Sequence, residues 1–489
     1  MNRTRGLIIN GRETSASSGR TAPDIGPWTG ETCAMVAAGT VEDITRAVDA
    51  ADAAFEGWAA TPPTERRAIF LRAANILTSR TQEIVELMAG EVGAVAPWAA
   101  FNVKLAADIL LEAAAAVTQP TGQLLATDQQ GAYSMQVRVP VGVIAAISPW
   151  NAPLILGVRA VALPLALGNT VVMKPSEDAP IACGLLISDV LHEAGLPAGA
   201  LNVVTNDRVD AAQVVSALIA DPRVRLVNFT GSTDVGRAIG VQAAQHLKPA
   251  VLELGGKNAL VVLEDADLDH AVNAATFGAY MNAGQICMCV DRVIVHRSVA
   301  DEFLAKFAQR VNALPYGDPT DPATAVGPVV SPQAAQRIAA LIADAVAKGA
   351  TLRAGTGTVE APGTLIKPAV LTGVTRDMDI FHGEIFGPAT VVHVVDDADE
   401  AVELANDTPY GLTAGVITED LAAGLDVARR IRTGIIHVND QSIADEPQAP
   451  FGGVKNSGYG RFGGQAGVDA FTDTRWITVQ AKGHAHYPI

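Results

Sequence analysis

The feature that most constrains the fold is a repeated alternation between short apolar segments and longer amphipathic ones. Short, largely apolar strands that are each followed by a helix are typical of a parallel sheet covered on both faces. In the first series, strands are expected at 141–148, 170–174, 201–205 and 225–229, with helices after Pro153 and at 180–194, 208–220 and 232–246. In such a sheet the crossovers are right-handed, and ligands bind at the carboxyl ends of the strands.

A second series of the same kind occupies residues 259–439. Its strands are expected at 259–263, 292–296, 390–395, 415–417 and 435–438, with helices between them. A chain of 489 residues is long enough for two to three domains. The two series therefore predict an α/β protein with two doubly wound domains and a cleft between them.

Three helices and two exposed strands are expected outside these series. Apolar residues recur at every third or fourth position in 41–58, 64–90 and 97–117, which predicts helices. At 133–140 and again at 475–480, apolar and polar residues alternate, as in half-exposed strands. The first of these strands is therefore expected on a projecting hairpin or at a sheet edge.

Composition excludes several classes of protein. Hydrophobic residues make up 49% and charged residues 18%, which excludes a disordered chain. The net charge of −17 repels phosphate backbones and anionic lipid heads, so no nucleic-acid or membrane partner is expected. Four cysteines cannot form a disulfide framework, and no secretory signal opens the chain, so a cytoplasmic location is expected. His and Cys show no zinc-ligand spacing, and no metal site is expected.

Two segments carry side chains suited to covalent catalysis. Cys287 follows small residues in NAGQIC, where a thiol activated by backbone dipoles, a cation or a base can act as a nucleophile. The alternative is a buried structural cysteine. Glu253 lies in the Gly-rich segment ELGGK and can act as a general base towards water. The alternative is a salt-bridged residue in a turn.

Three further segments come directly after expected strands. Asn151 in SPWNAP can donate to an oxyanion, or it can cap the helix that follows. Lys174 and Glu177 in KPSE can hold ribose hydroxyls, or they can lie in an exposed charged loop. FTGS at 229–232 has the strand, turn and helix context of a phosphate-binding helix N-terminus. The literal GxGxxG at 458–463 lacks a preceding apolar strand and is not interpreted as a dinucleotide fingerprint.

Together and in this order, the segments resemble the NAD(P)-dependent aldehyde dehydrogenase superfamily over essentially the whole chain. The matching motifs are PWN at 149–151, KPSE at 174–177, FTGS at 229–232, ELGGK at 253–257, GQxC at 284–287, EIFGP at 384–388 and PFGG at 450–453. The resemblance implies an NAD-binding domain at 1–117 and 141–252, a catalytic domain at 253–455, and a small β flap for oligomerisation at 118–140 and 470–489. The alternating strands fit that flap, and exposed sheet edges invite pairing, so a homodimer or homotetramer is expected.

The resemblance also implies a role for each site residue. Cys287 is the expected nucleophile and Glu253 the general base, and Asn151 is the oxyanion donor together with the backbone N–H of Cys287. The expected contacts to the dinucleotide are Lys174, Glu177, Gly231, Ser232, Glu384, Phe386 and Trp150. The Glu177 carboxylate accepts from a free 2′-hydroxyl and repels a 2′-phosphate, which favours NAD over NADP, although Lys174 can tolerate a phosphate.

Within the family, the chain is most similar to the benzaldehyde, vanillin and salicylaldehyde dehydrogenases. The segments that carry this likeness are GQICM, DEPQAPFGG at 445–453, GYGRFGG at 458–464 and HYPI at 486–489. An aromatic aldehyde is therefore the expected substrate, in contact with Ala152, Arg159, Phe451 and Tyr459. Arg159 can meet a ring hydroxyl or carboxylate, or form a structural salt bridge. Tyr459 can line the mouth of the pocket, or pack against its neighbours.

The implied reaction passes through a thiohemiacetal and a thioester on Cys287, which water activated by Glu253 then hydrolyses to the acid. Two related functions stay open. One is an aldehyde dehydrogenase for aliphatic or semialdehyde substrates, and the other is a coenzyme A-dependent acylating enzyme, in which Glu253 is dispensable. A non-catalytic protein that kept the fold is disfavoured, because Cys287, Glu253 and Asn151 are all present.

Overall fold

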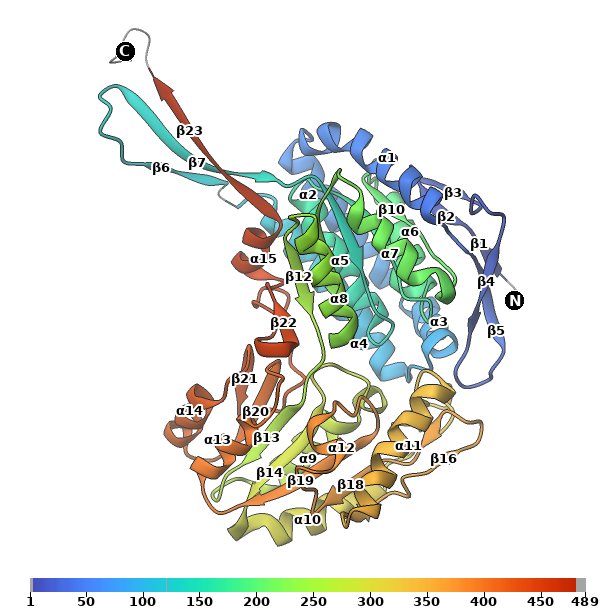
Figure 1. The fold of residues 1–489 in the computed structure, drawn as a ribbon, viewed down its shortest axis with the longest axis vertical. Helices are drawn as coiled ribbons and strands as arrows, with labels where there is room; N and C mark the ends of the chain where they lie inside the picture. The colour runs from blue at the N-terminus through green and yellow to red at the C-terminus, as the bar shows by residue number, and fades with distance from the viewer. Residues whose placement is uncertain (1–2, 120, 481–489) are drawn as a thin grey trace.

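The computed structural model describes residues 3–119 and 121–480, which form two α/β bodies and a projecting three-stranded sheet (Figure 1). The first body is built on an eight-stranded sheet. In spatial order its strands are β22 (Gly458–Tyr459), β12 (Ala250–Glu253), β11 (Val224–Thr230), β8 (Val143–Ile147), β9 (Thr170–Lys174), β10 (Leu201–Val203), β2 (Leu7–Ile9) and β3 (Arg12–Thr14). The strands from β12 to β10 run parallel, which confirms the predicted α/β class.

The central strands of this sheet are apolar because they are buried on both faces. Every residue of β8 and β9 is buried. One face is covered by α5 (Pro153–Ala166) and α6 (Leu186–Glu193), with α2 (Pro63–Ser79), α3 (Thr81–Val92) and α4 (Ala96–Ala116) in a further layer outside them. The other face is covered by α1 (Val41–Ala59), α7 (Ala211–Ala220) and α8 (Thr233–Gln245). The register aligns Lys174 with Ile147 and Thr230 with Glu253, so the chemically notable segments leave the sheet at one edge.

The second body is built on a seven-stranded sheet. In spatial order its strands are β15 (Thr351–Ala354), β18 (Ala369–Thr372), β19 (Ala389–Val395), β14 (Val290–His296), β13 (Asn258–Val262), β20 (Thr413–Ile417) and β21 (Ile435–Val438). Its helices are α9 (Leu268–Tyr280), α10 (Arg297–Asn312), α11 (Pro332–Ala347), α12 (Asp379–His382), α13 (Ala398–Asn406) and α14 (Leu421–Arg430). The chain crosses from the first sheet to the second between β12 and β13, directly after Glu253.

The third sheet projects from the first body as a long ribbon at the upper left of Figure 1. It consists of β6 (Gly122–Leu125), β7 (Ala132–Pro140) and β23 (Thr472–Gln480), and β7 pairs with β23 along its whole length. The two strands predicted from alternation therefore pair with each other, although they are more than 300 residues apart in sequence. Residues 481–489 of the expected flap, with the HYPI segment, lie outside the described residues.

One predicted helix is wrong. The pattern at 64–90 predicts a single helix, but α2 ends at Ser79 and α3 begins at Thr81, with Arg80 between them. Hydroxyl groups compete for the backbone at this point, because Thr78 donates to the carbonyl of Ala74 at 2.9 Å and Ser79 to that of Ile76 at 2.7 Å. No Gly or Pro lies at the break, and the apolar spacing continues across it, so the sequence does not indicate two helices.

The N-terminal strands were not predicted at all. β1 (Arg3–Arg5), β5 (Thr32–Ala37) and β4 (Thr21–Ile25) form a small sheet, and β2 and β3 extend the first sheet. The remaining strands and α-helix of the described residues are β16 (Val359–Glu360), β17 (Leu365–Ile366) and α15 (Gly464–Ala470). Within 3–119 and 121–480, no single helix has the length and apolarity to cross a bilayer, and only the bent pair α3 and α4 reaches them when the two are taken together.

Candidate active site

Two cavities meet at Cys287. The larger, of about 290 Å³, is lined by residues of both bodies: Pro149, Trp150, Asn151, Thr230, Gly231, Ser232, Glu253, Gly255, Cys287, Arg337, Glu384 and Phe386. The smaller, of about 30 Å³, is lined mainly by apolar side chains: Trp98, Phe101, Leu105, Asn151, Ala152, Ile155, Leu156, Arg159, Ile286, Cys287, Met288, Ile443, Asp445 and Phe451. Asn151 and Cys287 line both cavities, so a group held on the sulfur lies at their junction.

The backbone before Cys287 is tightly folded. After α9 the chain forms a short 3-10 turn, η3 (Met281–Gly284), in which Asn282 has a φ of 50°. The Asn282 amide donates to the carbonyl oxygen of Asn151 at 2.9 Å, and Asn258 Nδ2 donates to the carbonyl oxygen of Cys287 at 2.8 Å. Asparagine tolerates this left-handed conformation, but Ala283 follows it with a φ of 55°, which is strained for alanine. These side-chain hydrogen bonds therefore hold the loop that presents the sulfur.

Asn151 reaches this loop and does not cap helix α5. The residue at the N-cap of α5 is Ala152, and Asn151 Nδ2 donates to the carbonyl oxygen of Gln285 at 3.0 Å. An amide nitrogen carries two N–H groups, so the second remains available to an acceptor in the cavities that Asn151 lines. The alternative interpretation of Asn151 as a helix cap is wrong.

The buried Glu253 carboxylate lies beside the half-buried thiol of Cys287. Glu253 is 2% exposed, and within the described residues neither of its carboxylate oxygens makes a well-formed hydrogen bond. Burial raises the pKa of Glu253 to about 7, although the nearby Cys287 thiol and the charge of Arg159 lower it in part. Burial, followed by the charge of Glu253, raises the pKa of Cys287 well above its ordinary value. Without substrate, the proton therefore belongs to the thiol, and Glu253 titrates near neutral pH.

A second buried carboxylate, Glu384, lies across the larger cavity. Its Oε1 accepts from the backbone N–H of Gly256 at 3.0 Å, and burial raises its pKa to about 8. A side chain at Gly255 would place Cβ 2.5 Å from the Glu384 carboxylate, so only glycine admits this approach. Phe386 has a φ of 46° and its ring lies edge-on to Trp150, with centroids 5.7 Å apart. The two aromatic rings and Glu384 thus enclose one end of the cavity.

Three charged side chains fix the segment that carries Glu384. Arg337 donates to the carbonyl oxygens of Glu384 at 3.2 Å and Ile385 at 2.6 Å. The buried Lys257 forms an ion pair with Asp291 at 3.2 Å, and Asp291 accepts from the backbone N–H of Ile385 at 3.0 Å. The lysine of the ELGGK motif is therefore structural, since it supports the loop opposite Glu253.

Gly231 and Ser232 lie where β11 passes into α8. Ser232 is the N-cap of α8, and the N–H of Gly231 donates to the carbonyl oxygen of Glu253 at 3.0 Å. The first N–H groups of a helix have no partners within it and attract anions. This end of the larger cavity therefore suits a phosphate group.

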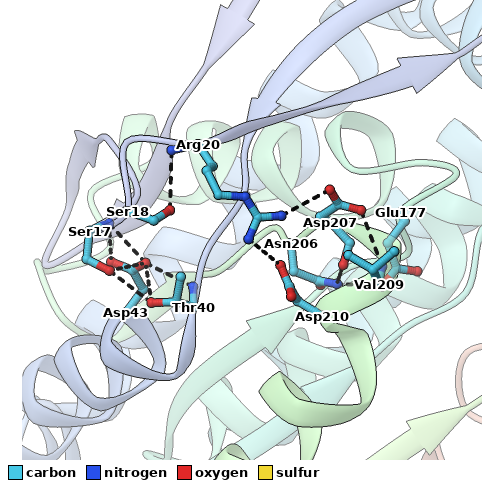
Figure 2. A network of polar contacts seen from close by, with 10 residues as sticks. All are labelled: Ser17, Ser18, Arg20, Thr40, Asp43, Glu177, Asn206, Asp207, Val209 and Asp210. Atoms are coloured by element: carbon cyan, nitrogen blue, oxygen red, sulfur yellow. Dashed lines mark hydrogen bonds and ion pairs between the residues drawn. The ribbon is translucent and has the colours of Figure 1, made fainter.

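Lys174 and Glu177 form an ion pair and do not line the cavities at Cys287. The Glu177 carboxylate also accepts from Asn206 Nδ2 at 2.9 Å, within the polar network of Figure 2. Burial alone raises the pKa of Glu177, but Lys174 and these hydrogen bonds outweigh it, so its pKa lies below the ordinary value. In the same network, Arg20 is bound by Asp207 and Asp210 (Figure 2). Lys174 and Arg20 therefore each have an acidic partner, as does the nearby Arg208, which pairs with Asp178.

Of the four predicted substrate contacts, three line the smaller cavity. These are Ala152, Arg159 and Phe451. Arg159 forms a buried ion pair with Asp445, and its guanidinium lies 4.3 Å from the centre of the Phe451 ring. Tyr459 lies elsewhere, since it pairs with Leu252 on β22, is 52% exposed and lines neither cavity at Cys287. The prediction of Tyr459 at the pocket mouth does not agree with this position.

Sequence reasoning missed several residues that shape the site. Asn258 and Arg337 give no sequence signal, because each acts on backbone atoms of a distant segment. Trp98 and Phe101 form an aromatic wall of the smaller cavity. Both lie on α4, and the apolar pattern of this segment predicts only a buried helix. Asp445 stands within the quoted DEPQAPFGG segment, and its pairing with Arg159 was the alternative left open for that arginine.

Comparison with known proteins agrees with this geometry. The pattern of the aldehyde dehydrogenase family matches residues 14–477. A vanillin dehydrogenase of Pseudomonas fluorescens is 50% identical over 483 residues, which cover 99% of each chain. A salicylaldehyde dehydrogenase of Pseudomonas sp. (strain C18) is 44% identical over 475 residues, covering 97% of this chain and 98% of that one.

Among solved structures, the crystal structure of a salicylaldehyde dehydrogenase from Pseudomonas putida G7 complexed with salicylaldehyde superposes with a TM-score of 0.97, at 42% identity and with full coverage of both chains. The predicted resemblance is thereby confirmed. The protein is an enzyme that oxidises an aldehyde with NAD(P), and the chain belongs to the aldehyde dehydrogenase family.

Proposed function

We propose that the protein oxidises aromatic aldehydes to carboxylic acids with NAD, through a thioester on Cys287. The observation that carries this proposal is the position of Cys287, which lines both a larger cavity suited to the cofactor and a smaller, largely apolar pocket suited to a ring. The relatives named above act on vanillin and salicylaldehyde, and both are aromatic aldehydes. Their high identity over nearly the full chain supports the same substrate class here.

The residues of the larger cavity fit a nicotinamide dinucleotide. The N-terminus of α8 at Gly231 and Ser232 suits the phosphates, and Glu384 with Phe386 and Trp150 suits the nicotinamide ribose and ring. Glycine at 255 keeps the way to Glu384 open. NAD bound there supplies the acceptor for the hydride that leaves the aldehyde carbon.

The first chemical step belongs to Cys287. Its thiol must lose its proton to solvent before it attacks the aldehyde carbon, because the thiolate is the nucleophile. The attack makes the aldehyde oxygen negative. The free N–H of Asn151 and the backbone N–H of Cys287 stabilise this charge, and one such donor lowers the barrier by about 3–4 kcal/mol.

The second step belongs to Glu253. After the hydride has left, a thioester remains on Cys287, and the buried carboxylate deprotonates the water that hydrolyses it. A pKa of about 7 leaves Glu253 ionised in a large fraction of molecules at neutral pH while keeping it basic enough to take a proton. The carboxylic acid is then released, and the thiol is restored.

NAD is favoured over NADP by the groups around Glu177. A 2′-phosphate needs an unpaired cation, but Lys174 is bound by Glu177, Arg208 by Asp178, and Arg20 by two aspartates. The Glu177 carboxylate itself accepts from a ribose hydroxyl and repels a phosphate.

The projecting sheet supports assembly into a homodimer or homotetramer. Leu124, Tyr133 and Trp476 of this sheet are 73%, 67% and 72% exposed, which is unusual for side chains of their size. We infer that a second subunit covers them. We also propose that the NAD-binding domain comprises residues 1–117 and 141–252, the catalytic domain 253–455, and the flap 118–140 and 470–489. The cytoplasmic location expected from cysteine usage stays a prediction.

A kinetic panel tests the proposal. The purified protein is incubated with NAD or NADP and with benzaldehyde, vanillin or an aliphatic aldehyde, and NADH or NADPH is followed together with the acid product. We expect the highest kcat/KM with an aromatic aldehyde and NAD, and loss of the signal in Cys287→Ser. Preference for aliphatic aldehydes, or an acyl-coenzyme A product when coenzyme A is added, would contradict it.

A further inference from the structure

The apolar pocket beside Cys287 contains an ion pair in which only one of the two carboxylate oxygens has a hydrogen-bond partner. Arg159 lies on α5 and Asp445 on the loop after β21, and their side chains are 8% and 6% exposed. The guanidinium Nη2 of Arg159 binds Asp445 Oδ2. Oδ1 of the same carboxylate is buried and has no hydrogen-bond partner within 3–119 and 121–480.

A buried acceptor without a donor is costly, because it loses its hydrogen bonds to water and gains none in return. The surroundings of Asp445 offer little compensation. Arg159 also lies over the ring of Phe451, and the nearest pocket walls are apolar, with Leu105, Ile155 and Ile443 among them. The missing donor therefore has to come from a molecule that enters the pocket.

The ion pair lies in a wall between two cavities. Arg159, Asp445 and Phe451 line both the pocket at Cys287, of about 30 Å³, and a neighbouring cavity of about 160 Å³. A cavity that binds benzene has a volume of about 150 Å³, so the inner pocket must widen before an aromatic ring enters it, and the neighbouring cavity gives this shared wall room to move.

We propose that Asp445 Oδ1 accepts a hydrogen bond from a hydroxyl group on the ring of the aldehyde, and so makes the enzyme selective for hydroxylated benzaldehydes. This inference rests on the proposed oxidation of aromatic aldehydes. With the aldehyde oxygen at Asn151 and a ring hydroxyl at Asp445, the substrate is held at two points. Arg159 is a positioning residue, since it holds Oδ2 and leaves Oδ1 to the substrate.

The chemistry of the carboxylate defines what is selected. A phenolic hydroxyl donates a proton to a carboxylate, and a hydrogen bond to a charged acceptor is stronger than one between neutral groups. A methoxy group of similar shape has no proton to donate. Selection by Asp445 therefore separates hydroxy-substituted from methoxy-substituted rings, which a purely structural ion pair does not.

The test compares kcat/KM for 2-, 3- and 4-hydroxybenzaldehyde with that for the matching methoxybenzaldehydes and for benzaldehyde. We expect at least one hydroxybenzaldehyde to exceed its methoxy partner by about tenfold to a hundredfold. In the double variant Arg159→Met, Asp445→Leu, this ratio is expected to fall to about one. The double change removes both charges, because removal of one leaves the other buried and unpaired.

The ion pair of Arg5 with Asp189 provides a matched control in the same body, remote from both cavities at Cys287. Arg5→Met, Asp189→Leu is expected to keep the wild-type ratio even where it lowers stability. A ratio near one in the wild type, or a ratio that survives in the Arg159 and Asp445 double variant, overturns the inference. If no benzaldehyde of the panel is oxidised while aliphatic aldehydes are, the proposed function itself fails.

A second measurement needs no variant. Phenol and anisole are each tested as competitive inhibitors of benzaldehyde oxidation by the wild-type enzyme. Phenol, which donates a proton, is expected to inhibit at about a tenfold lower concentration than anisole, which does not. Equal inhibition by the two compounds overturns the role of Asp445, and it leaves the oxidation of benzaldehyde untouched.

Discussion

Replacing Glu253 by glutamine is expected to slow the enzyme and stabilise it at the same time. The substitution keeps the shape of the side chain and removes a charge from a site that is 2% exposed. Burial is the main reason that the pKa of Glu253 rises from 4.5 to about 7. This rise corresponds to about 3 kcal/mol of unfavourable free energy for the ionised form in the folded protein.

The sign of the pH dependence follows from the raised pKa. Between pH 4.5 and about 7 the folded protein keeps the Glu253 proton while the unfolded chain releases it, so wild-type stability falls as pH rises through this window. Glutamine does not ionise, so the stability of the variant does not fall in this way between pH 4.5 and about 7. We expect it to be more stable than the wild type by up to about 3 kcal/mol at pH 9, with almost no difference at pH 4.5.

The assay combines melting curves with rapid mixing. The melting temperatures of both proteins are recorded across the pH range, and the production of NADH is followed after mixing with aldehyde and NAD. Loss of a general base slows steady-state turnover by about 10²–10⁴-fold. The first turnover still yields about one NADH per site, because hydride leaves before hydrolysis. The wild-type rate rises with pH through about 7, and this dependence is expected to vanish in the variant.

Two results would refute this reasoning. Unchanged steady-state turnover in Glu253→Gln would show that another group activates water. If the variant is no more stable than the wild type at high pH, ionisation of the Glu253 carboxylate does not destabilise the folded protein. The same comparison near pH 4.5 serves as the internal control, because both proteins then carry a neutral side chain at this position.

Three further predictions concern other parts of the site and the projecting sheet. Asn151→Ala removes one oxyanion donor and is expected to lower kcat by about 10²–10³-fold, measured by steady-state kinetics, and an unchanged kcat would exclude this role. Glu177→Gln frees Lys174 and is expected to lower the ratio of kcat/KM for NAD over NADP by about tenfold; a constant ratio would argue against Glu177 as the discriminating group. Trp476→Asp places a charge on a side chain that is 72% exposed, and it is expected to weaken subunit association by about 2 kcal/mol or more, detected by analytical ultracentrifugation at several concentrations. Sedimentation identical to wild type would remove Trp476 from the interface.

The regular core was predictable because its signals are local. Buried parallel strands such as β8 and β9 are apolar over their whole length, and the predicted segments 141–148 and 170–174 contain them. The break at Arg80 was not predictable, because the hydroxyl groups that end α2 sit within an unbroken apolar spacing. The N-terminal strands were missed for a different reason, since β2 is only three residues long and joins the sheet by pairing with β10, almost 200 residues further along the chain.

The residues of the site also fall into those that the sequence indicates and those that it does not. Residue type and segment made Cys287, Glu253 and Asn151 candidates with structural alternatives, and the resemblance of the ordered motifs to the family gave them their expected roles. The residues that hold them in place could not be predicted, because Asn258 acts on the backbone of a loop 29 residues further along the chain. Tyr459 shows the limit of motif reasoning. Its segment resembles the family pattern, yet its side chain lies on the outer strand β22.

The central claim is that the sulfur of Cys287 carries the acyl group between hydride loss and hydrolysis. Its most direct test is mass spectrometry of the Glu253→Gln variant, quenched in acid after mixing with benzaldehyde and NAD, followed by peptide mapping. We predict one benzoyl group per chain, attached to Cys287 and absent when NAD is omitted. A variant that produces NADH while Cys287 stays unmodified, or that carries the benzoyl group on Cys289, would contradict the account.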